Sequence, residues 1–167
     1  MASINEFKNR MTGGGARPNQ FKVNVAFPPI QGANTTLAAR NIEFLCKAAT
    51  LPASTIENIG VSYRGRPVNF AGERSFEPWT ITVYNDTDFV IRDAFERWSN
   101  AIMNNSSTIG TVNPASYQRD MIVHQLKRDG TTARAYKFVN AYPANVGAIQ
   151  LDYDSNNQIE TFDVTFQ

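Results

Sequence analysis

The segment between Glu43 and Tyr84 constrains the fold of this chain more than any other stretch. It ends in a six-residue run, Trp79–Tyr84, in which large apolar residues alternate with threonine and tyrosine. A period of two predicts a strand with one buried face. Near its start, the apolar run Phe44–Cys46 leads to Leu51-Pro52, where the proline ring disfavours helix at the preceding residue. Both ends of the segment are therefore predicted to lie in a sheet.

Between those ends, residues Gly60–Arg74 are too polar for a core and too rich in β-forming residues for a plain linker. We therefore predict a long hairpin-like loop that projects from the sheet and contacts something else. Its three arginines, Arg64, Arg66 and Arg74, allow two interpretations. They are incidental charges on a solvated loop, or they pair with acidic groups on a neighbouring subunit, because guanidinium groups bind carboxylates in a bidentate manner.

The remaining pattern predicts a mainly β protein, a β-sandwich or barrel-like domain of about six to eight strands with one helix packed on the sheet. The helix is expected over Phe89–Asn104, after a run of short polar residues able to cap it. Polar loops are expected over residues 31–40 and 110–118, and a connection over 143–147. The strands are expected over residues 20–27, 41–48, 79–84, 119–127, 131–141, 149–153 and 159–167.

The N-terminus is predicted to be an arm, residues 1–17, attached to a single domain, residues 18–167. Ile4 and Phe7 fall on one side of a short amphipathic turn over Ala2–Arg10. Three successive glycines, Gly13–Gly15, then interrupt it, because glycine loses more conformational freedom than other residues when it is ordered. The arm is either a frayed terminus or a segment that orders on a partner.

Composition and motifs point away from several classes of function. Lys and Arg total 16 against 15 Asp and Glu, so the basic excess that tight nucleic-acid binding needs is missing. No apolar stretch approaches the roughly 20 residues of a membrane span, and Met1–Met11 has no hydrophobic signal core. The single cysteine, Cys46, is expected to be a small buried hydrophobe.

No cofactor, metal or catalytic group is predicted. His124, the only histidine, has no nearby nucleophile in sequence and is expected to be packed or to face a pore. Four residues near the C-terminus match positions 1, 3, 5 and 12 of a calcium loop, but the sixth position is Asn157 instead of glycine. A hairpin turn rich in Asp and Asn explains them better than a metal site does. These residues are Asp152, Asp154, Asn156 and Asp163.

An ordered set of segments resembles the tail tube proteins of contractile-tailed bacteriophages, and the set covers nearly the whole chain. The segments are Ala16–Phe21, Cys46–Ala53, Val68–Arg74, Trp79–Asp86, the helix around Phe95 and Trp98, and Asn145–Gly147 followed by Leu151–Asn157.

The resemblance implies a structural virion protein that forms hexameric rings, whose inner strands join into one ring-wide β-barrel. The rings stack into the inner tail tube, a conduit for phage DNA and the tape-measure protein. Implied partners are further copies of the chain, the tail sheath, the baseplate and the tail-terminator protein, with assembly in the host cytoplasm. It also implies that the arm and the loop bridge adjacent rings. The residues expected to make these inter-subunit contacts are Ile4, Phe7, Tyr63, Arg64, Arg66 and Arg74.

Two other functions fit the same patterns. The chain could be the tube protein of a related contractile injection or type VI secretion system. It could also be a monomeric β-sandwich binding module, for which a concave aromatic patch and a monomer in solution are expected. If the chain forms a tube, we expect one polar face of the alternating strands, without clustered Lys and Arg, to line the lumen.

Overall fold

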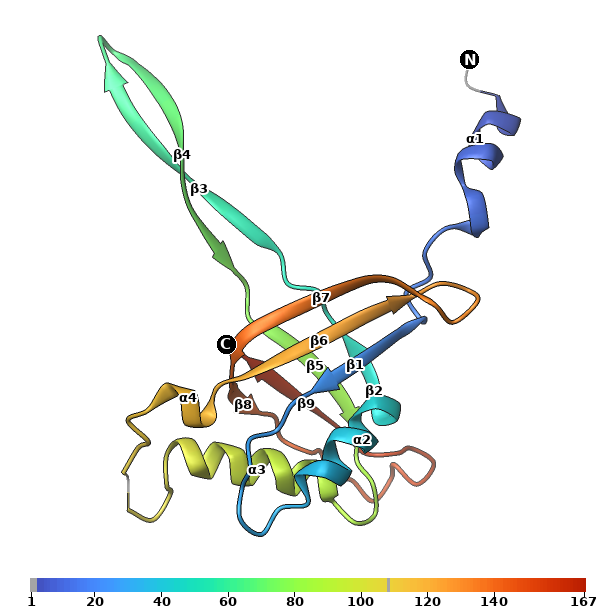
Figure 1. Ribbon diagram of the computed structural model, residues 1–167, viewed down its shortest axis with the longest axis vertical. Coiled ribbons are helices and arrows are strands. Elements are labelled where there is room, and N and C mark those ends of the chain that lie inside the picture. The colour runs from blue at the N-terminus through green and yellow to red at the C-terminus, as the bar shows by residue number, and fades with distance from the viewer. Residues whose placement is uncertain (1–2, 108) are drawn as a thin grey trace.

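The computed structural model of this chain describes residues 3–107 and 109–167, so the first two residues of the predicted arm lie outside the described part. Two antiparallel sheets face each other, helices close one open side, and a long hairpin and an N-terminal helix project from the opposite end (Figure 1). The strands are β1 (Phe21–Val25), β2 (Cys46–Ala49), β3 (Ser54–Tyr63), β4 (Arg66–Phe76), β5 (Trp79–Tyr84), β6 (Arg119–Leu126), β7 (Thr132–Ala141), β8 (Pro143–Val146) and β9 (Thr161–Phe166). The helices are α1 (Ile4–Arg10), the 3₁₀ turn η1 (Thr12–Gly14), α2 (Thr35–Leu45), α3 (Val90–Ile102) and α4 (Pro114–Tyr117).

The prediction of a mainly β sandwich with one main helix is confirmed. One sheet has the order β1-β6-β7, the other β2-β5-β9-β8, and every pairing is antiparallel. The predicted alternation in β5 is also confirmed, because Trp79, Ile81 and Val83 are all buried. The β6–β7 hairpin forms as expected around the Asp129-Gly130 turn, where Gly130 adopts a φ of 82°.

Aromatic residues dominate the core between the sheets and α3. The ring of Trp79 stacks on Phe138 with centroids 4.4 Å apart, and on Phe166 at 5.1 Å. From α3, the Phe95 ring meets the Phe166 ring edge-on at 5.9 Å. The helix begins close to its predicted start, where the backbone N–H of Val90 donates to Oδ1 of Asp86. The packed helix and both sheets thus share one continuous apolar interior.

The strand predicted over residues 41–48 is wrong for its first part, because α2 occupies residues 35–45 and only β2 is extended. The apparent alternation of Ile42, Phe44 and Cys46 does not describe burial, since Phe44 is 82% exposed. The buried pair is instead Ala38 and Ile42, which are four residues apart and lie on one face of a helix. Asn34 caps that helix by accepting a hydrogen bond from the N–H of Leu37. The polar loop predicted over residues 31–40 is wrong for residues 35–40 for the same reason, whereas residues 31–34 form a loop.

The C-terminal hairpin predicted between residues 149–153 and 159–167 is also wrong. The partner of β9 is β8, within the segment that was predicted to be a connection. Proline is tolerated at Pro143 because it is the first residue of an edge strand. Leu151 is 81% exposed, so its alternation with polar neighbours has no core to face. Two smaller differences are the single turn α4 within the predicted loop 110–118 and the total of nine strands among the described residues.

Candidate assembly interface

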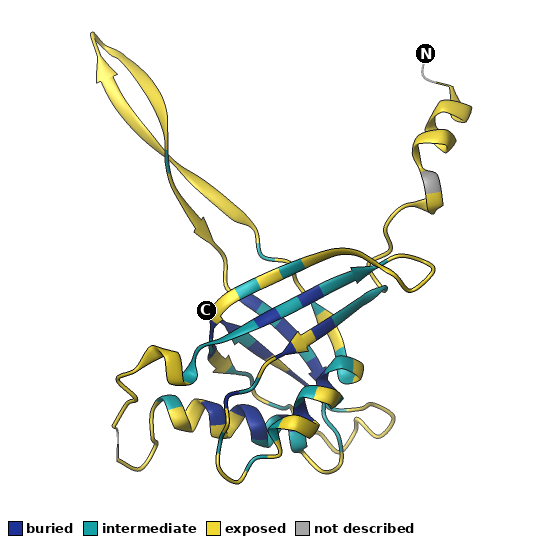
Figure 2. Ribbon diagram, in the orientation of Figure 1, coloured by how far each residue is buried: buried dark blue, intermediate teal, exposed yellow. Residues whose placement is uncertain are grey.

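The β3–β4 hairpin is the most exposed regular structure in the chain. It pairs only with itself among the described residues and stands away from the sandwich (Figure 1). Every residue of its two strands is exposed except Gly72, which is half-buried (Figure 2). A Cβ at that position would lie 2.9 Å from the carbonyl oxygen of Glu57, so the close approach at the bulge requires glycine. The predicted projecting hairpin is therefore present, and the described part of the chain leaves it exposed along its length.

The two faces of this hairpin differ in chemistry. Residues directly opposite each other share a face, and successive pairs alternate between faces. Beyond the bulge, one face carries Ile59, Val61, Tyr63, Val68 and Phe70, which we call the apolar hairpin face, and at the tip it also carries Arg66. The other face carries small and polar residues, Asn58, Gly60, Ser62, Pro67, Asn69 and Ala71. On that face the Nδ2 atom of Asn58 donates to Oδ1 of Asn69 at 3.0 Å.

The arginines of the predicted contact set are not one cluster. Arg64 and Gly65 form the two-residue turn with φ values of 49° and 81°, as short hairpin turns require. The Arg64 guanidinium lies 5.4 Å from the centroid of the Tyr63 ring, and Arg66 pairs with Tyr63 across the strands. Arg74 lies on the other side of the bulge, opposite Ile56. Tyr63, Arg64 and Arg66 therefore form the tip, and Arg74 belongs to the base.

The N-terminal helix α1 projects from the same end of the sandwich as the hairpin, well separated from it (Figure 1). Ser3 and Glu6 form a reciprocal capping box at its start. Ile4 and Phe7 are 74% and 64% exposed, and no residue of the helix is buried. The described part of the chain thus leaves the predicted contact residues Ile4 and Phe7 largely exposed, and whether they touch another copy stays a prediction.

The outer face of the four-stranded sheet is polar and rich in threonine. Opposite pairs on β5 and β9 place Thr80 beside Thr165 and Thr82 beside Asp163. The two hydroxyls of the first pair lie 3.2 Å apart, and the Thr82 hydroxyl donates to Oδ1 of Asp163 at 2.6 Å. Sequence reasoning placed Thr80 and Thr82 on the face opposite Trp79 but did not assign them, or Thr165 and Asp163, to the expected polar lining. The alternation around Phe162 was the signal that could have found the β9 residues.

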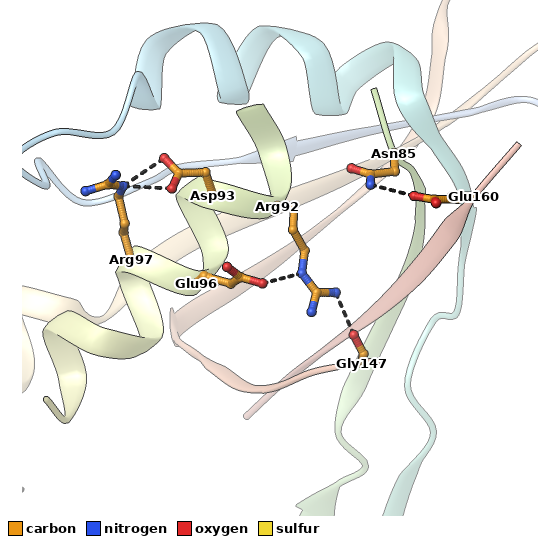
Figure 3. A network of polar contacts seen from close by, with 7 residues as sticks. All are labelled: Asn85, Arg92, Asp93, Glu96, Arg97, Gly147 and Glu160. Atoms are coloured by element: carbon orange, nitrogen blue, oxygen red, sulfur yellow. Dashed lines mark hydrogen bonds and ion pairs between the residues drawn. The ribbon is translucent and has the colours of Figure 1, made fainter. Parts of the chain in front are cut away.

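A network of polar contacts ties the β8–β9 connection to α3 and to the end of β5 (Figure 3). Arg92 contacts both Oε1 of Glu96 and the carbonyl oxygen of Gly147, each at 2.6 Å. At the other end of the connection, Asn85 donates from its backbone N–H and its Nδ2 atom to Glu160. Both ends of the loop over residues 147–160 are therefore fixed to the body.

In the described part of the chain, the side chains that commonly bind metal ions are not gathered into a site. Among residues 3–107 and 109–167, no group of three or more His, Cys, Asp and Glu side chains could hold a metal ion. Asp152 instead accepts a hydrogen bond from the N–H of Asp154, the predicted Asx turn. Cys46 is half-buried, and burial raises the pKa of its thiol to about 12, far from that of a nucleophile. His124 is half-buried on β6, between Lys22 of β1 and Ala135 of β7.

Within the described part of the chain, no helix combines the length and the apolar character that crossing a lipid bilayer requires.

Comparison with known proteins decides the family. A sequence model described as "Phage tail tube protein" matches residues 16–167. The chain belongs to this family. Tail tube protein gp19 of Enterobacteria phage T4 is 38% identical over 151 residues, which cover 90% of this chain and 86% of that protein. The chain is thus a tail tube protein of the phage virion, a component of the tail, and the predicted resemblance is confirmed.

Solved structures share the fold of this tail tube protein at low sequence identity. A chain of the anti-feeding prophage cap has a TM-score of 0.65 at 16% identity, covering 91% of this chain and 85% of that one. A chain of the sheath-tube complex of an extracellular contractile injection system has a TM-score of 0.58 at 13% identity, covering 99% and 93%. Membership of a structural family favours a non-enzymatic role.

Proposed function

We propose that this tail tube protein forms hexameric rings in which the four-stranded sheet of each copy becomes part of one ring-wide β-barrel, and that the rings stack into the inner tail tube. The observation that carries the proposal is the four-stranded sheet itself. Within the described residues, its outer strands β2 and β8 pair on one side only. Unpaired strand edges recruit strands from other chains. Repetition of one such contact around an axis closes a ring.

The polar outer face of this sheet suits the lining of a conduit. It presents threonine hydroxyls, Tyr84, Asp163 and the ammonium group of Lys47, which lies 5.6 Å from the centre of the Tyr84 ring. One cation and one anion per copy provide neither an apolar surface nor a dense basic one. Passing DNA would release few counterions and would therefore be held weakly. The face of the three-stranded sheet fits less well, because Ile122 lies there among charged residues.

The hairpin and the arm would then bridge successive rings. Both project from one end of the body, and both carry apolar side chains that the described part of the chain leaves exposed. The proposed domain division, an arm over residues 1–17 and a body over 18–167, follows this geometry. The conduit would hold the tape-measure protein before the DNA passes. The sheath, the baseplate and the tail terminator would contact its outside and its ends.

Two experiments test this function. Electron microscopy of the purified protein should show rings and stacked tubes, whereas a monomer at high concentration would contradict it. Cysteine labelling then tests which sheet lines the lumen. In a Cys46→Ala background, Thr165→Cys should react with a bulky polymer maleimide before assembly and be protected in tubes. Ala135→Cys, on the outer face of the three-stranded sheet, is the matched control and should stay reactive. The reverse result would mean that the other sheet faces the lumen.

A further inference from the structure

The tip of the β3–β4 hairpin is a cationic and aromatic surface that the described part of the chain leaves exposed. Among the described residues, no ion pair involves Arg64 or Arg66, and the Arg64 guanidinium lies 5.4 Å from the centroid of the Tyr63 ring. The nearest acidic residues of the hairpin, Glu57 and Glu73, lie back at the bulge. A two-stranded hairpin with both faces in water is marginally stable by itself. The tip therefore requires a partner that offers carboxylates and apolar surface together.

A surface of that kind lies at the far end of the same molecule. The β8–β9 loop, residues 147–160, is at the end of the body opposite the hairpin tip (Figure 1). Leu151 is 81% exposed, and Tyr153 is fully exposed. Asp152 and Asp154 are exposed between and beside them, and no cation of the described chain pairs with either one. Of these residues, Leu151, Asp152 and Tyr153 also line a cavity of about 830 Å³.

The loop is held in place for such a contact. At its start, the N–H of Gly147 donates to the carbonyl oxygen of Asp163 at 2.7 Å, and its own carbonyl accepts from Arg92 (Figure 3). A Cβ on this glycine would lie 2.9 Å from the Asp163 carbonyl oxygen, so the close approach excludes a side chain. At the other end, Glu160 is bound by Asn85. With both ends anchored, less ordering remains to oppose binding.

We propose that the hairpin tip of one copy docks on the β8–β9 loop of a copy in the next ring, with Arg64 and Arg66 pairing with Asp152 and Asp154. In this contact Tyr63 packs against the exposed apolar side chains of the loop. The cations of the tip and the carboxylates of the loop lie at opposite ends of one molecule, and both ends carry exposed apolar side chains. Stacking in a single direction therefore brings a tip against a loop, and this contact repeats without closing. The inference rests on the stacked tube proposed above and adds the receiving surface.

A charge exchange tests the pairing. The double variant Arg64→Glu/Arg66→Glu and the double variant Asp152→Arg/Asp154→Arg each place like charges in contact. Each should raise the protein concentration needed for tube formation at least about tenfold, the effect of losing one strong pair, and should leave rings intact. Combining all four changes restores opposite charges and should restore tubes. The measurements are sedimentation of tubes and counting of rings and tubes by electron microscopy.

The β6–β7 turn offers a matched control. Lys127→Glu/Arg128→Glu makes the same change of charge at two adjacent exposed cations on another hairpin, and it should leave the tube-forming concentration within about twofold of wild type, as surface charges away from a contact usually do. The pairing is wrong if the tip variant stacks like wild type. It is also wrong if both double variants are defective and the quadruple variant does not recover tube formation. A wild-type protein that forms rings but no tubes, or neither, would overturn the proposed function and the inference with it.

A cross-linking measurement does not depend on how the charge variants fold. Arg64→Cys combined with Asp154→Cys in a Cys46→Ala background should form inter-subunit disulfides when tubes are oxidised, giving a ladder of species on a denaturing gel. A disulfide requires the two Cα atoms to lie within about 7 Å. The pair Arg128→Cys/Asp154→Cys is the control. A ladder of equal yield from the control pair, or no ladder from the first pair in intact tubes, would contradict the proposed contact.

Discussion

Strand β5 and the β3–β4 hairpin follow the same sequence rule and reach opposite environments. Alternate positions are large and apolar in both, as Ile81 and Val83 in β5 and as Ile59 and Val61 in β3 illustrate. Ile81 and Val83 are fully buried, whereas Ile59 and Val61 are 53% and 49% exposed. The pattern therefore predicts that a strand has an apolar face, but not which chain covers that face. In an assembling protein, the exposed strand identifies the interface.

Removing the aromatic stack should have the largest effect on the subunit itself. Trp79 is buried and packs against both Phe138 and Phe166, so Trp79→Ala leaves a cavity and should cost about 3–5 kcal/mol of unfolding free energy. Urea titration followed by circular dichroism measures this loss. Trp79→Phe is the matched control, because it keeps a stacked six-membered ring and removes only part of the indole, including an N–H that has no partner in the described chain. Equal losses from the two variants would mean that ring stacking contributes little.

The hairpin should show the converse behaviour. Val61→Asp places a charge on the apolar hairpin face, where it would be buried in the assembly but not in the subunit. Urea unfolding should change by less than about 0.5 kcal/mol, as for other surface substitutions, while stacking into tubes is abolished. Ser62→Asp introduces the same charge one residue along, on the opposite face. If both variants stack equally, or if Val61→Asp unfolds the subunit, the contrast between the two regions fails.

Sequence reasoning located a helix or strand correctly where the apolar repeat continued along the whole element. The six-residue alternation in β5 and the repeated apolar stripe of α3 were both long enough to separate a period of two from one of 3.6. Residues 41–48 are too short a window to separate these two periods, because a helix that ends at Leu45 is followed at once by a strand from Cys46. Short windows across such a junction contain both periods, and tertiary burial of Ala38 and Ile42 decided the outcome.

The candidate interface was only partly accessible to sequence reasoning. The tip residues Tyr63, Arg64 and Arg66 could be chosen because charge and aromaticity stand out in a β-rich loop. The β8–β9 loop was predicted to contain a strand and a turn and was weighed as a metal motif, but not as a contact surface, since that role depends on its lying at the opposite end of the body from the hairpin. The spacing of residues along the sequence does not show which segments lie at opposite ends of the folded body. Arg74 was grouped with the tip by proximity in sequence, and the bulge between them places it at the base.

A smaller effect on stacking is expected from the arm. Ile4→Asp/Phe7→Asp removes the two most exposed apolar side chains of α1. If they dock on another ring, the tube-forming concentration should rise about three- to tenfold, the equivalent of roughly 1 kcal/mol, and deletion of residues 1–17 should do the same while rings persist. Asn5→Asp/Asn9→Asp adds equal charge to the other side of the helix. Unchanged tube length in the deletion, measured by electron microscopy, would refute a role for the arm in stacking.

The smallest effect concerns the β6–β7 hairpin, which is anchored by the core and also by an exposed ion pair. A hydrogen bond from Lys137, and then one from the backbone N–H of Asn140, hold the pKa of the Asp120 carboxyl below its usual range. Because the pKa is lower in the folded state, this contribution is present above about pH 4 and is lost as the pH falls through the folded pKa.

Asp120→Asn should therefore lower the urea midpoint slightly at neutral pH and match wild type once the carboxyl is protonated. A difference that persists in acid would instead point to the hydrogen bond with Asn140, whose φ of 58° needs local support. The double variant with Lys137→Gln separates the two contributions.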